Sequence, residues 1–434
     1  MKIYFKISLI IFILSIMMFN TASSQSEEDA RRLSYLGVGF GARALGLGTA
    51  FMPIANDYSA VYWNPAGIGQ IRRNEVSLGL SHYSYNNDAK TFGTEESFSN
   101  SVTNLNALGL VYPFPVLKGS LVFALGYARQ TDFTSALGFN GFNYKPTTIS
   151  YPDNIAMSGK ILESGGINNW IVAGAIEAVR DLYIGASLTF LSGSYTYTRD
   201  YLEDDVNNDY YLYQYIQKYT IDEDIGGFTA RVGMLQTFNN NQGRIGINIK
   251  FPSYFSLRDD YSQEQQFLDD NPAYDSLDYY SGVSEFDVVS PFVLSGGISW
   301  SFGNLLLSGA IDYTDWTQME FRNTYADLIQ ENTVIKQDMK ATVNFRLGAE
   351  FAIPGTDLQI RGGFAYLPSP YEFDSSPNDQ KFITGGLGWI IQNSVKFDIG
   401  YAYGYWDTDH VVEFAKTTEK IKTHTIIATA SYRF

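Results

Sequence analysis

Segments in which apolar and polar residues alternate recur along most of this 434-residue chain, and they restrict it to a β-sheet architecture. Residues 395–405 are the clearest case, with Val395 and Phe397 on one face and Lys396 and Asp398 on the other. The same alternation occurs over residues 182–190, 244–251 and 342–351. Because successive side chains of a strand point to opposite faces, each segment predicts a strand with one apolar face. Soluble β-sandwiches and transmembrane β-barrels both contain such strands, so alternation alone does not choose between them.

The lengths of the connections between these segments distinguish the two architectures. Short turns are predicted near residues 115–119, 180–181, 239–243, 302–304, 354–356 and 392–393. Long polar loops are predicted over residues 86–103, 131–166, 199–224, 257–285, 319–339, 367–379 and 406–421. The two kinds alternate, which gives about fourteen strands with both ends on the short-turn side, as in outer-membrane barrels. The predicted fold class is therefore all-β, a transmembrane antiparallel β-barrel.

Composition excludes several classes of function. A net charge of −16 without a basic stripe argues against binding of nucleic acid. The chain has no cysteine, which excludes disulfides, thiol catalysis and thiolate metal sites. His82, His410 and His424 are not spaced as metal ligands, and no nucleophile or phosphate-binding motif occurs. We therefore predict a protein that is not an enzyme and carries no metal or cofactor.

Both ends of the chain fit an outer-membrane location. Lys2 and Lys6 precede an apolar run over residues 7–19, and Ala22 and Ser24 are spaced for signal-peptidase cleavage. Residues 1–24 are thus predicted to be a secretory signal peptide, the alternative being a retained anchor. The last ten residues alternate and end on Phe434, which resembles the terminal-strand signal of bacterial outer-membrane proteins.

Residues 25–73 show no clear strand pattern, although they are too apolar for a solvated linker. They include a glycine-rich stretch over residues 37–48 and a turn signal over residues 62–67. An unfilled barrel of about fourteen strands would be a wide pore. We therefore predict that residues 25–73 are a hatch that plugs a barrel formed by residues 74–434, which disfavours a passive porin.

A family resemblance is specific in this region. Residues 41–51 and 55–67 resemble the N-terminal hatch of the FadL/toluene-transporter family (OMPP1/FadL/TodX), whose Asn-Pro-Ala hatch motif is matched by Asn64, Pro65 and Ala66. Residues 346–351, 361–366, 369–370 and 397–401 also match, whereas residues 130–285 match only by pattern. The structural alternative for the triplet is a rigid turn that anchors the plug.

The resemblance implies uptake of hydrophobic molecules, such as long-chain fatty acids or aromatic hydrocarbons, across the outer membrane. It also implies a fourteen-stranded barrel in contact with outer-membrane lipid and lipopolysaccharide, and an exit through a lateral gap beside a kinked strand. The hatch segment equally resembles PorV/PorQ barrels, which share the stretch Tyr-Trp-Asn-Pro-Ala. The alternative function is therefore a type IX secretion barrel that binds protein cargo or a secretion-system protein.

Candidate ligand-binding residues lie in the unusually apolar stretch of residues 131–166. A groove there would capture an apolar ligand by burial, at ~0.8 kcal/mol per CH₂ group, unless these side chains only pack the loops together. The predicted ligand-binding residues are Phe133, Phe139, Phe142, Tyr144, Ile155 and Met157. Acidic clusters at residues 203–205, 222–224, 259–260 and 269–270 lack the EF-hand register and are predicted to be solvated loop charge rather than Ca²⁺ sites. Inward-facing charges of the strands are expected to pair across the lumen or to meet a ligand carboxylate: Arg244, Lys250, Arg346, Glu350, Arg361, Lys396 and Asp398.

Overall fold

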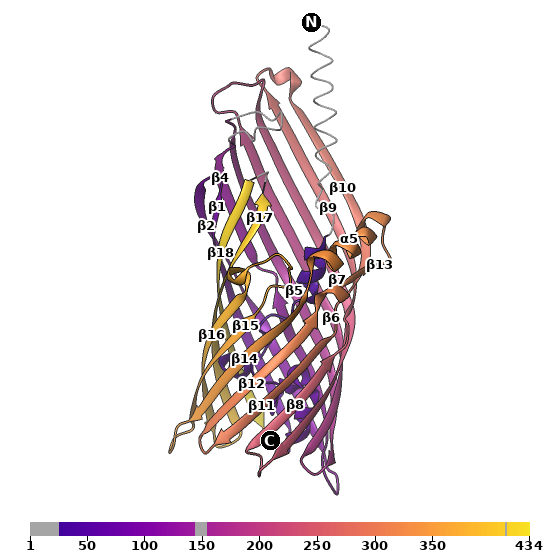
Figure 1. Cartoon of the computed structure of the whole chain (residues 1–434), viewed down its shortest axis with the longest axis vertical. Helices are drawn as coiled ribbons and strands as arrows, with labels where there is room; N and C mark the ends of the chain where they lie inside the picture. Colours follow the sequence, from indigo (N-terminus) through magenta and orange to yellow (C-terminus); the bar gives the residue numbers. More distant parts are fainter. Residues whose placement is uncertain (1–25, 144–153, 413–414) are drawn as a thin grey trace.

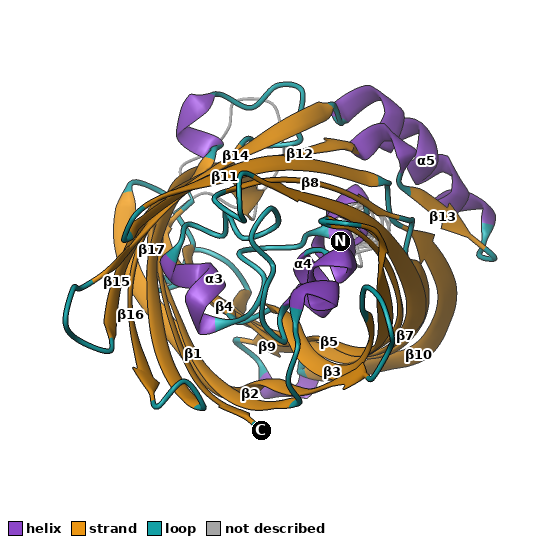
Figure 2. Cartoon of the chain, turned by 90° about the horizontal axis from the view of Figure 1, so that it is seen from below, coloured by secondary structure: helices purple, strands orange, loops and turns teal. Residues whose placement is uncertain are grey.

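A computed structural model describes residues 26–143, 154–412 and 415–434. The predicted signal peptide and the candidate residue Tyr144 lie outside these ranges. The described strands form one closed antiparallel barrel, in which β1 pairs with both β2 and the last strand, β18 (Figure 1). Figure 2 shows the ring of strands from below. The predicted all-β barrel of fourteen strands is therefore confirmed.

The helices of the N-terminal segment are α2 (Glu27–Ser34), α3 (Ala42–Gly46), α4 (Ala60–Trp63) and the 3-10 helix η1 (Pro65–Gln70). The strands from the first half of the chain are β1 (Glu75–Thr91), β2 (Thr94–Phe114), β3 (Leu121–Asp132), β4 (Ser135–Phe142), β5 (Ala156–Val179), β6 (Leu182–Asp204), β7 (Leu212–Phe238), β8 (Gly243–Lys250) and β9 (Tyr254–Asp269). The remaining strands are β10 (Ser276–Val289), β11 (Val293–Phe302), β12 (Leu305–Asp315), β13 (Glu320–Arg322), β14 (Ala341–Ala352), β15 (Leu358–Leu367), β16 (Gln380–Ile391), β17 (Val395–Val412) and β18 (Ala415–Arg433). Outside the N-terminal segment, the other helices are η2 (Pro272–Tyr274), η3 (Trp316–Gln318), α5 (Ala326–Asp338) and η4 (Ser376–Asn378).

Four positions of the barrel are each occupied by two consecutive strands, which reconciles eighteen labelled strands with fourteen positions. β3 and β4 both pair with β5, and β8 and β9 both pair with β7. β10 and β11 follow β9 and β8 around the ring, and β13 and β12 follow them in turn. Pro252 and Pro291 lie at two of these breaks, because proline has no backbone N–H for the sheet.

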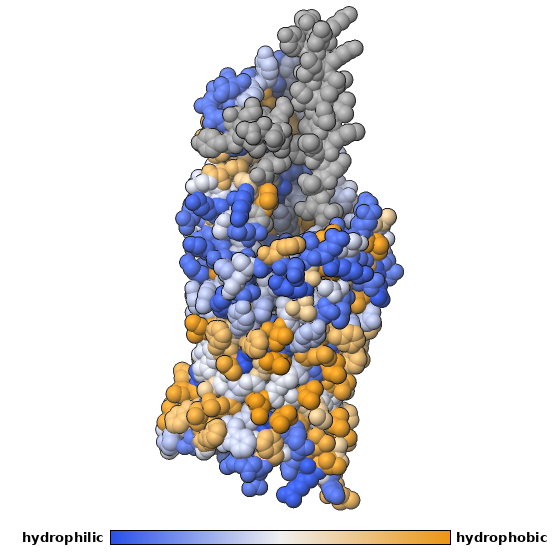
Figure 3. All heavy atoms as spheres, in the orientation of Figure 1, coloured by the Kyte–Doolittle hydropathy of each residue, from blue (hydrophilic) through white to orange (hydrophobic). Residues whose placement is uncertain are grey.

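The barrel wall has its apolar side chains outside and its charges inside. Ile247 and Leu347 are among many large apolar residues that are about half exposed, whereas Arg346, Arg361 and Asp398 are buried. Apolar residues gather around the lower half of the molecule in Figure 3, between polar turns and a polar upper part. Apolar side chains outside and charges inside are the reverse of the arrangement in a water-soluble protein, and they are typical of a sheet surrounded by lipid.

The predicted short turns are confirmed: each lies between the strands that the sequence placed around it. The predicted long loops are mostly wrong, because β1, β2, β6, β7, β9, β10, β17 and β18 continue through them as paired strands. Antiparallel hairpins satisfy their own backbone hydrogen bonds, so these strands can extend beyond the apolar band that faces lipid. The hairpin of β9 and β10 projects in this way in Figure 1. Residues 319–339 form the short strand β13 and helix α5, and residues 367–379 form turns and the short helix η4.

Residues 26–73 lie largely within the ring of strands. Figure 2 shows α3 and α4 inside the barrel, whereas α5 lies outside it. The side chains from Phe40 to Ile71 are almost entirely buried and share one apolar cluster with small residues of β2, β3 and β5, including Ala107, Ala124 and Ala173. No helix in the described ranges is both long and apolar enough to span a membrane.

Candidate functional site

The Asn-Pro-Ala triplet fixes the N-terminal segment to the barrel wall. Asn64 is fully buried, its Oδ1 accepts from the Ala66 N–H at 3.2 Å, and its Nδ2 donates to the Met234 carbonyl of β7 at 3.2 Å. The wall provides room for this turn with glycines: a Cβ at Gly233 would overlap the Asn64 side chain, and one at Gly185 would overlap the Pro65 backbone. The turn is thus both locally capped and docked on two strands.

A second Asn-Pro-Ala sequence, residues 271–273, shows which part of this geometry is local. Asn271 Oδ1 accepts from the Ala273 N–H at 3.2 Å, as Asn64 does from Ala66, but this turn is exposed at the tip of the β9–β10 hairpin. The triplet itself therefore specifies only a capped turn. Burial against β6 and β7 distinguishes the copy inside the barrel.

Because the two copies share their local cap, they form a matched pair for mutation. We expect Asn64→Ala to destabilise the N-terminal segment by about 1–3 kcal/mol, since it removes a buried bond to β7 as well as the cap. Asn271→Ala removes the exposed cap alone and should change stability by less. Thermal unfolding and the protease sensitivity of residues 26–73 measure the difference; equal effects of the two substitutions would contradict the anchoring role.

An ion-pair network ties α3 to the opposite wall. Arg43 binds Glu350 of β14 through two bonds of 2.8 Å and donates to Asn56 at 2.6 Å. Arg361 of β15 donates to the same Glu350 at 2.6 Å and to Asp398 of β17 at 2.7 Å. The sequence left open whether these inward charges pair across the lumen or meet a ligand carboxylate. In the structure, Glu350, Arg361 and Asp398 pair with one another and with the N-terminal segment.

Above the buried part of the N-terminal segment, at the barrel end opposite the short turns, lies a cavity of about 910 Å³. We call it the vestibule. Its walls come from α2, residues 131–137, and inward-facing positions of β1, β5, β6 and β7, together with residues 367–374 and the outer ends of β17 and β18. It has the size expected of a small-molecule site.

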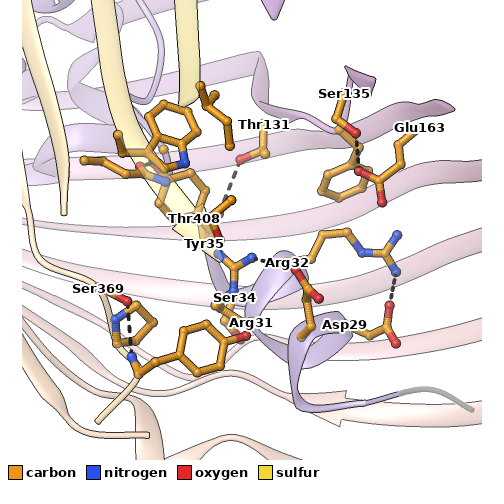
Figure 4. Close-up of a pocket in the computed structure, with 18 of the residues that line it drawn as sticks. Asp29, Arg31, Arg32, Ser34, Tyr35, Thr131, Ser135, Glu163, Ser369 and Thr408 are labelled. Atoms are coloured by element: carbon orange, nitrogen blue, oxygen red, sulfur yellow. Dashed lines mark hydrogen bonds and ion pairs between the residues drawn. The ribbon is translucent and has the colours of Figure 1, made fainter. Parts of the chain in front are cut away.

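Helix α2 lines the vestibule, and its residue Arg32 joins the helix to the barrel wall (Figure 4). Arg32 forms ion pairs with Asp29 at 3.0 Å and with Glu223 of β7 at 3.4 Å. Its guanidinium lies 3.3 Å from the ring centre of Tyr195 and 5.3 Å from that of Phe133. A cation is thus held between aromatic rings and carboxylates.

Two tyrosines next to α2 remain neutral. Burial raises the pKa of Tyr35 to about 12 and the pKa of Tyr371 to about 12. Tyr371 lies under Arg31, whose guanidinium is 5.7 Å from the ring centre. The vestibule therefore presents uncharged phenol rings at neutral pH.

The barrel wall beside the vestibule has an interrupted hydrogen-bond ladder. Pairing of β3 with β2 ends at Ala107 and Ala128, and among the described strands β4 pairs with β5 rather than with β2. Side chains bridge the interruption: Asn104 of β2 donates to Asp132 at 2.7 Å. The outward side of β2 changes here from leucines to serines and threonines, so the interruption begins at the outer rim of the apolar band.

The candidate ligand-binding residues do not form one groove. Phe133 lines the vestibule, whereas Phe139, Ile155 and Met157 are buried together in an apolar cluster with Tyr201 and Tyr215. Phe142 is partly buried at the end of β4. Their proposed ligand contacts stay a prediction; packing between strands accounts for the burial of three of them.

Sequence reasoning missed several residues of the vestibule. Glu223 and Asp259 belong to acidic clusters that were predicted to be solvated loop charge, but both are buried and stand directly opposite each other on β7 and β9. Arg31 and Arg32 lie in a short charged stretch that carried no functional prediction. The sequence signal that could have identified Arg31 and Arg32 is a pair of adjacent arginines in a short helix that precedes an acidic barrel.

Comparisons with known proteins agree with this architecture. The family model described as "Outer membrane protein transport protein (OMPP1/FadL/TodX)" matches residues 33–434. A Pseudomonas aeruginosa FadL homologue has a TM-score of 0.61 at 14% identity, over 92% of this chain and 100% of that one. The P. putida toluene transporter TodX gives 0.58 at 12% identity, over 87% and 94%, and the Ralstonia pickettii toluene transporter TbuX 0.55 at 16%, over 92% and 99%. A search of curated protein sequences found no match.

Proposed function

Because the chain belongs to the OMPP1/FadL/TodX family of outer-membrane transport proteins, we propose that it takes up hydrophobic molecules of the fatty-acid or aromatic-hydrocarbon class. The observation that carries this proposal is the family match over residues 33–434. The similar structures include two toluene transporters.

The geometry suits uptake in three steps. A ligand enters the vestibule, where rings such as Phe133, Tyr195 and Tyr371 offer apolar surface. The buried segment from Phe40 to Ile71 acts as the hatch: it blocks the straight path through the barrel, and its movement opens the way to the exit. The interrupted ladder between β2 and β3 supplies the exit, in keeping with the lateral gap that the family resemblance implies.

Ligand retention tests this proposal. Native mass spectrometry of the barrel released from detergent should reveal a bound apolar molecule, and the barrel should bind the uncharged reporter N-phenylnaphthylamine. Ile161 lines the vestibule, so Ile161→Asn should weaken binding of the reporter about tenfold through lost apolar burial. Leu277→Asn, on the exposed β9–β10 hairpin, is the control and should leave binding unchanged.

Two results would contradict uptake. One is a barrel that neither retains an apolar molecule nor binds the reporter. The other is equal reporter binding by the Ile161→Asn and Leu277→Asn variants. A protein that co-purifies in place of a small molecule would instead favour the secretion-barrel alternative.

A further inference from the structure

The charges that line the vestibule are strongly unbalanced. Among the described lining residues, thirteen carry a carboxyl group, four carry a guanidinium and none is a lysine. The acids come from α2, α5 and several strands and loops, so the imbalance surrounds the cavity instead of marking one wall. A ligand inside it experiences a negative potential from several directions.

Three of the four arginines that line the vestibule are already paired with carboxylates. Arg31 pairs with Glu28 at 3.3 Å, Arg346 pairs with Asp312 at 2.8 Å, and Arg32 has its two partners on α2 and β7. A ligand carboxylate would have to displace one of these partners, and it would then meet the displaced side chain at close range.

Several carboxylates face the cavity without a cation of their own. Glu163 of β5 accepts hydrogen bonds from Tyr195 at 2.6 Å and from Ser135, and the described residues give it no ion pair (Figure 4). Asp338 at the end of α5 also has no ion pair within the described ranges. Such groups favour a ligand that brings a positive charge or a hydrogen-bond donor.

Ser34 gives an independent indication that something binds here. Its side chain lines the vestibule and is only 6% exposed, yet among the described residues its hydroxyl has no hydrogen-bond partner. Buried polar groups are normally hydrogen-bonded, so this hydroxyl is suited to the polar head of a bound molecule.

Arg32 shows what kind of head group such surroundings hold. Its guanidinium rests on the Tyr195 ring and beside Phe133 while it pairs with carboxylates on both sides. Aromatic faces and carboxylates together form the type of site that binds organic cations. The ring of Tyr195 already carries Arg32, and its hydroxyl donates to Glu163. An ammonium head would therefore lie on the cavity side of Glu163, beside these aromatic rings.

We infer that the vestibule selects its ligands by the charge of the head group. It accepts amphiphiles whose polar head is uncharged or cationic, such as alcohols and alkyl- or arylammonium ions, and it rejects carboxylates. This inference rests on the proposed uptake of hydrophobic molecules and narrows its substrate class: fatty-acid anions are poor ligands.

Three ligands with the same apolar chain test the selection. Octanol, octylammonium and octanoate are titrated calorimetrically at pH 7 into the barrel in phosphatidylcholine nanodiscs, with empty nanodiscs as the reference. We expect octanol and octylammonium to bind at least about tenfold more tightly than octanoate. The double variant Glu163→Gln/Asp338→Asn should reduce the preference for octanol and octylammonium over octanoate to about threefold or less, because it removes two negative charges that have no ion-pair partner among the described residues.

A control separates the vestibule from the net charge of the whole protein. Asp209→Asn/Asp278→Asn removes the same charge from exposed positions outside the cavity and should leave the ratio unchanged. Octanoate binding as tightly as octanol, or equal effects of the two double variants, would overturn the selection by head-group charge but leave the proposed uptake of hydrophobic molecules standing. Failure of all three ligands to bind would overturn the proposed function as well.

Discussion

Deleting residues 26–71 should convert the protein into an open pore whose conductance in planar bilayers is roughly tenfold or more above that of the intact chain. The intact barrel should conduct little, because the segment from Phe40 to Ile71 fills the lumen with buried side chains. A fourteen-stranded ring is wide enough to conduct ions once it is emptied.

The emptied barrel has a physical reason to remain folded. The pairing of β1 with β18 closes the ring of strands, so the first and last strands find hydrogen-bond partners in each other. Some inward-facing charges also pair within the wall, such as Arg361 with Asp398. Water in the lumen can hydrate these pairs, as in porins. If the deletion variant is not recovered, the double substitution Arg43→Ala/Asn64→Ala loosens the same segment and should raise conductance in the same direction.

The matched control shortens the chain where it does not fill the lumen. Replacing residues 263–280 of the β9–β10 hairpin by Asn-Gly removes an exposed projection (Figure 1) and should leave the conductance low. High conductance of the intact protein, or the same rise in both shortened proteins, would show that residues 26–71 are not the plug.

The alternating segments predicted the strands, because lipid imposes a period of two on every strand, and the short turns between them pointed to the barrel. The extension of the strands beyond the apolar band was not predictable in the same way. There no face meets lipid, so stretches such as residues 199–224 lose the contrast between apolar and polar faces and resemble loops, although β6 and β7 pair on both sides of the turn at residues 205–211. Hydrogen bonding along the backbone, which leaves little trace in composition, decides their structure.

The candidate site was only partly predictable for a different reason. Apolar residues in 131–166 indicated a groove, but β4 and β5 bury most of them against neighbouring strands. The vestibule draws its charges from elements as distant in sequence as Arg32 and Glu223. Their juxtaposition depends on strand register around a closed ring, which local patterns do not specify. The family resemblance, in contrast, identified the Asn-Pro-Ala turn directly, because a docked turn needs particular residues at consecutive positions.

Uptake as proposed requires the N-terminal segment to move, and the chain offers a direct way to prevent that movement. Val61 of α4 is buried against β3: a Cβ built at Gly126 lies 3.2 Å from the Val61 Cγ2 atom, the place that a cysteine sulfur would take. In a disulfide with an S–S bond of about 2.05 Å, each Cβ lies about 3 Å from the sulfur of the other cysteine, so this spacing suits a cross-link. Since the chain has no native cysteine, Val61→Cys/Gly126→Cys introduces a single cross-link between hatch and wall.

The decisive measurement is therefore the entry of N-phenylnaphthylamine into cells that express this double variant, before and after addition of a reducing agent. We predict that the oxidised protein admits the reporter at least about tenfold more slowly than the reduced protein, since a disulfide constrains the relative position of the segments it joins. Each single cysteine variant should be insensitive to the reducing agent. Equal entry rates for the cross-linked and the reduced double variant, with the cross-link verified by mass spectrometry, would contradict passage through a moving hatch.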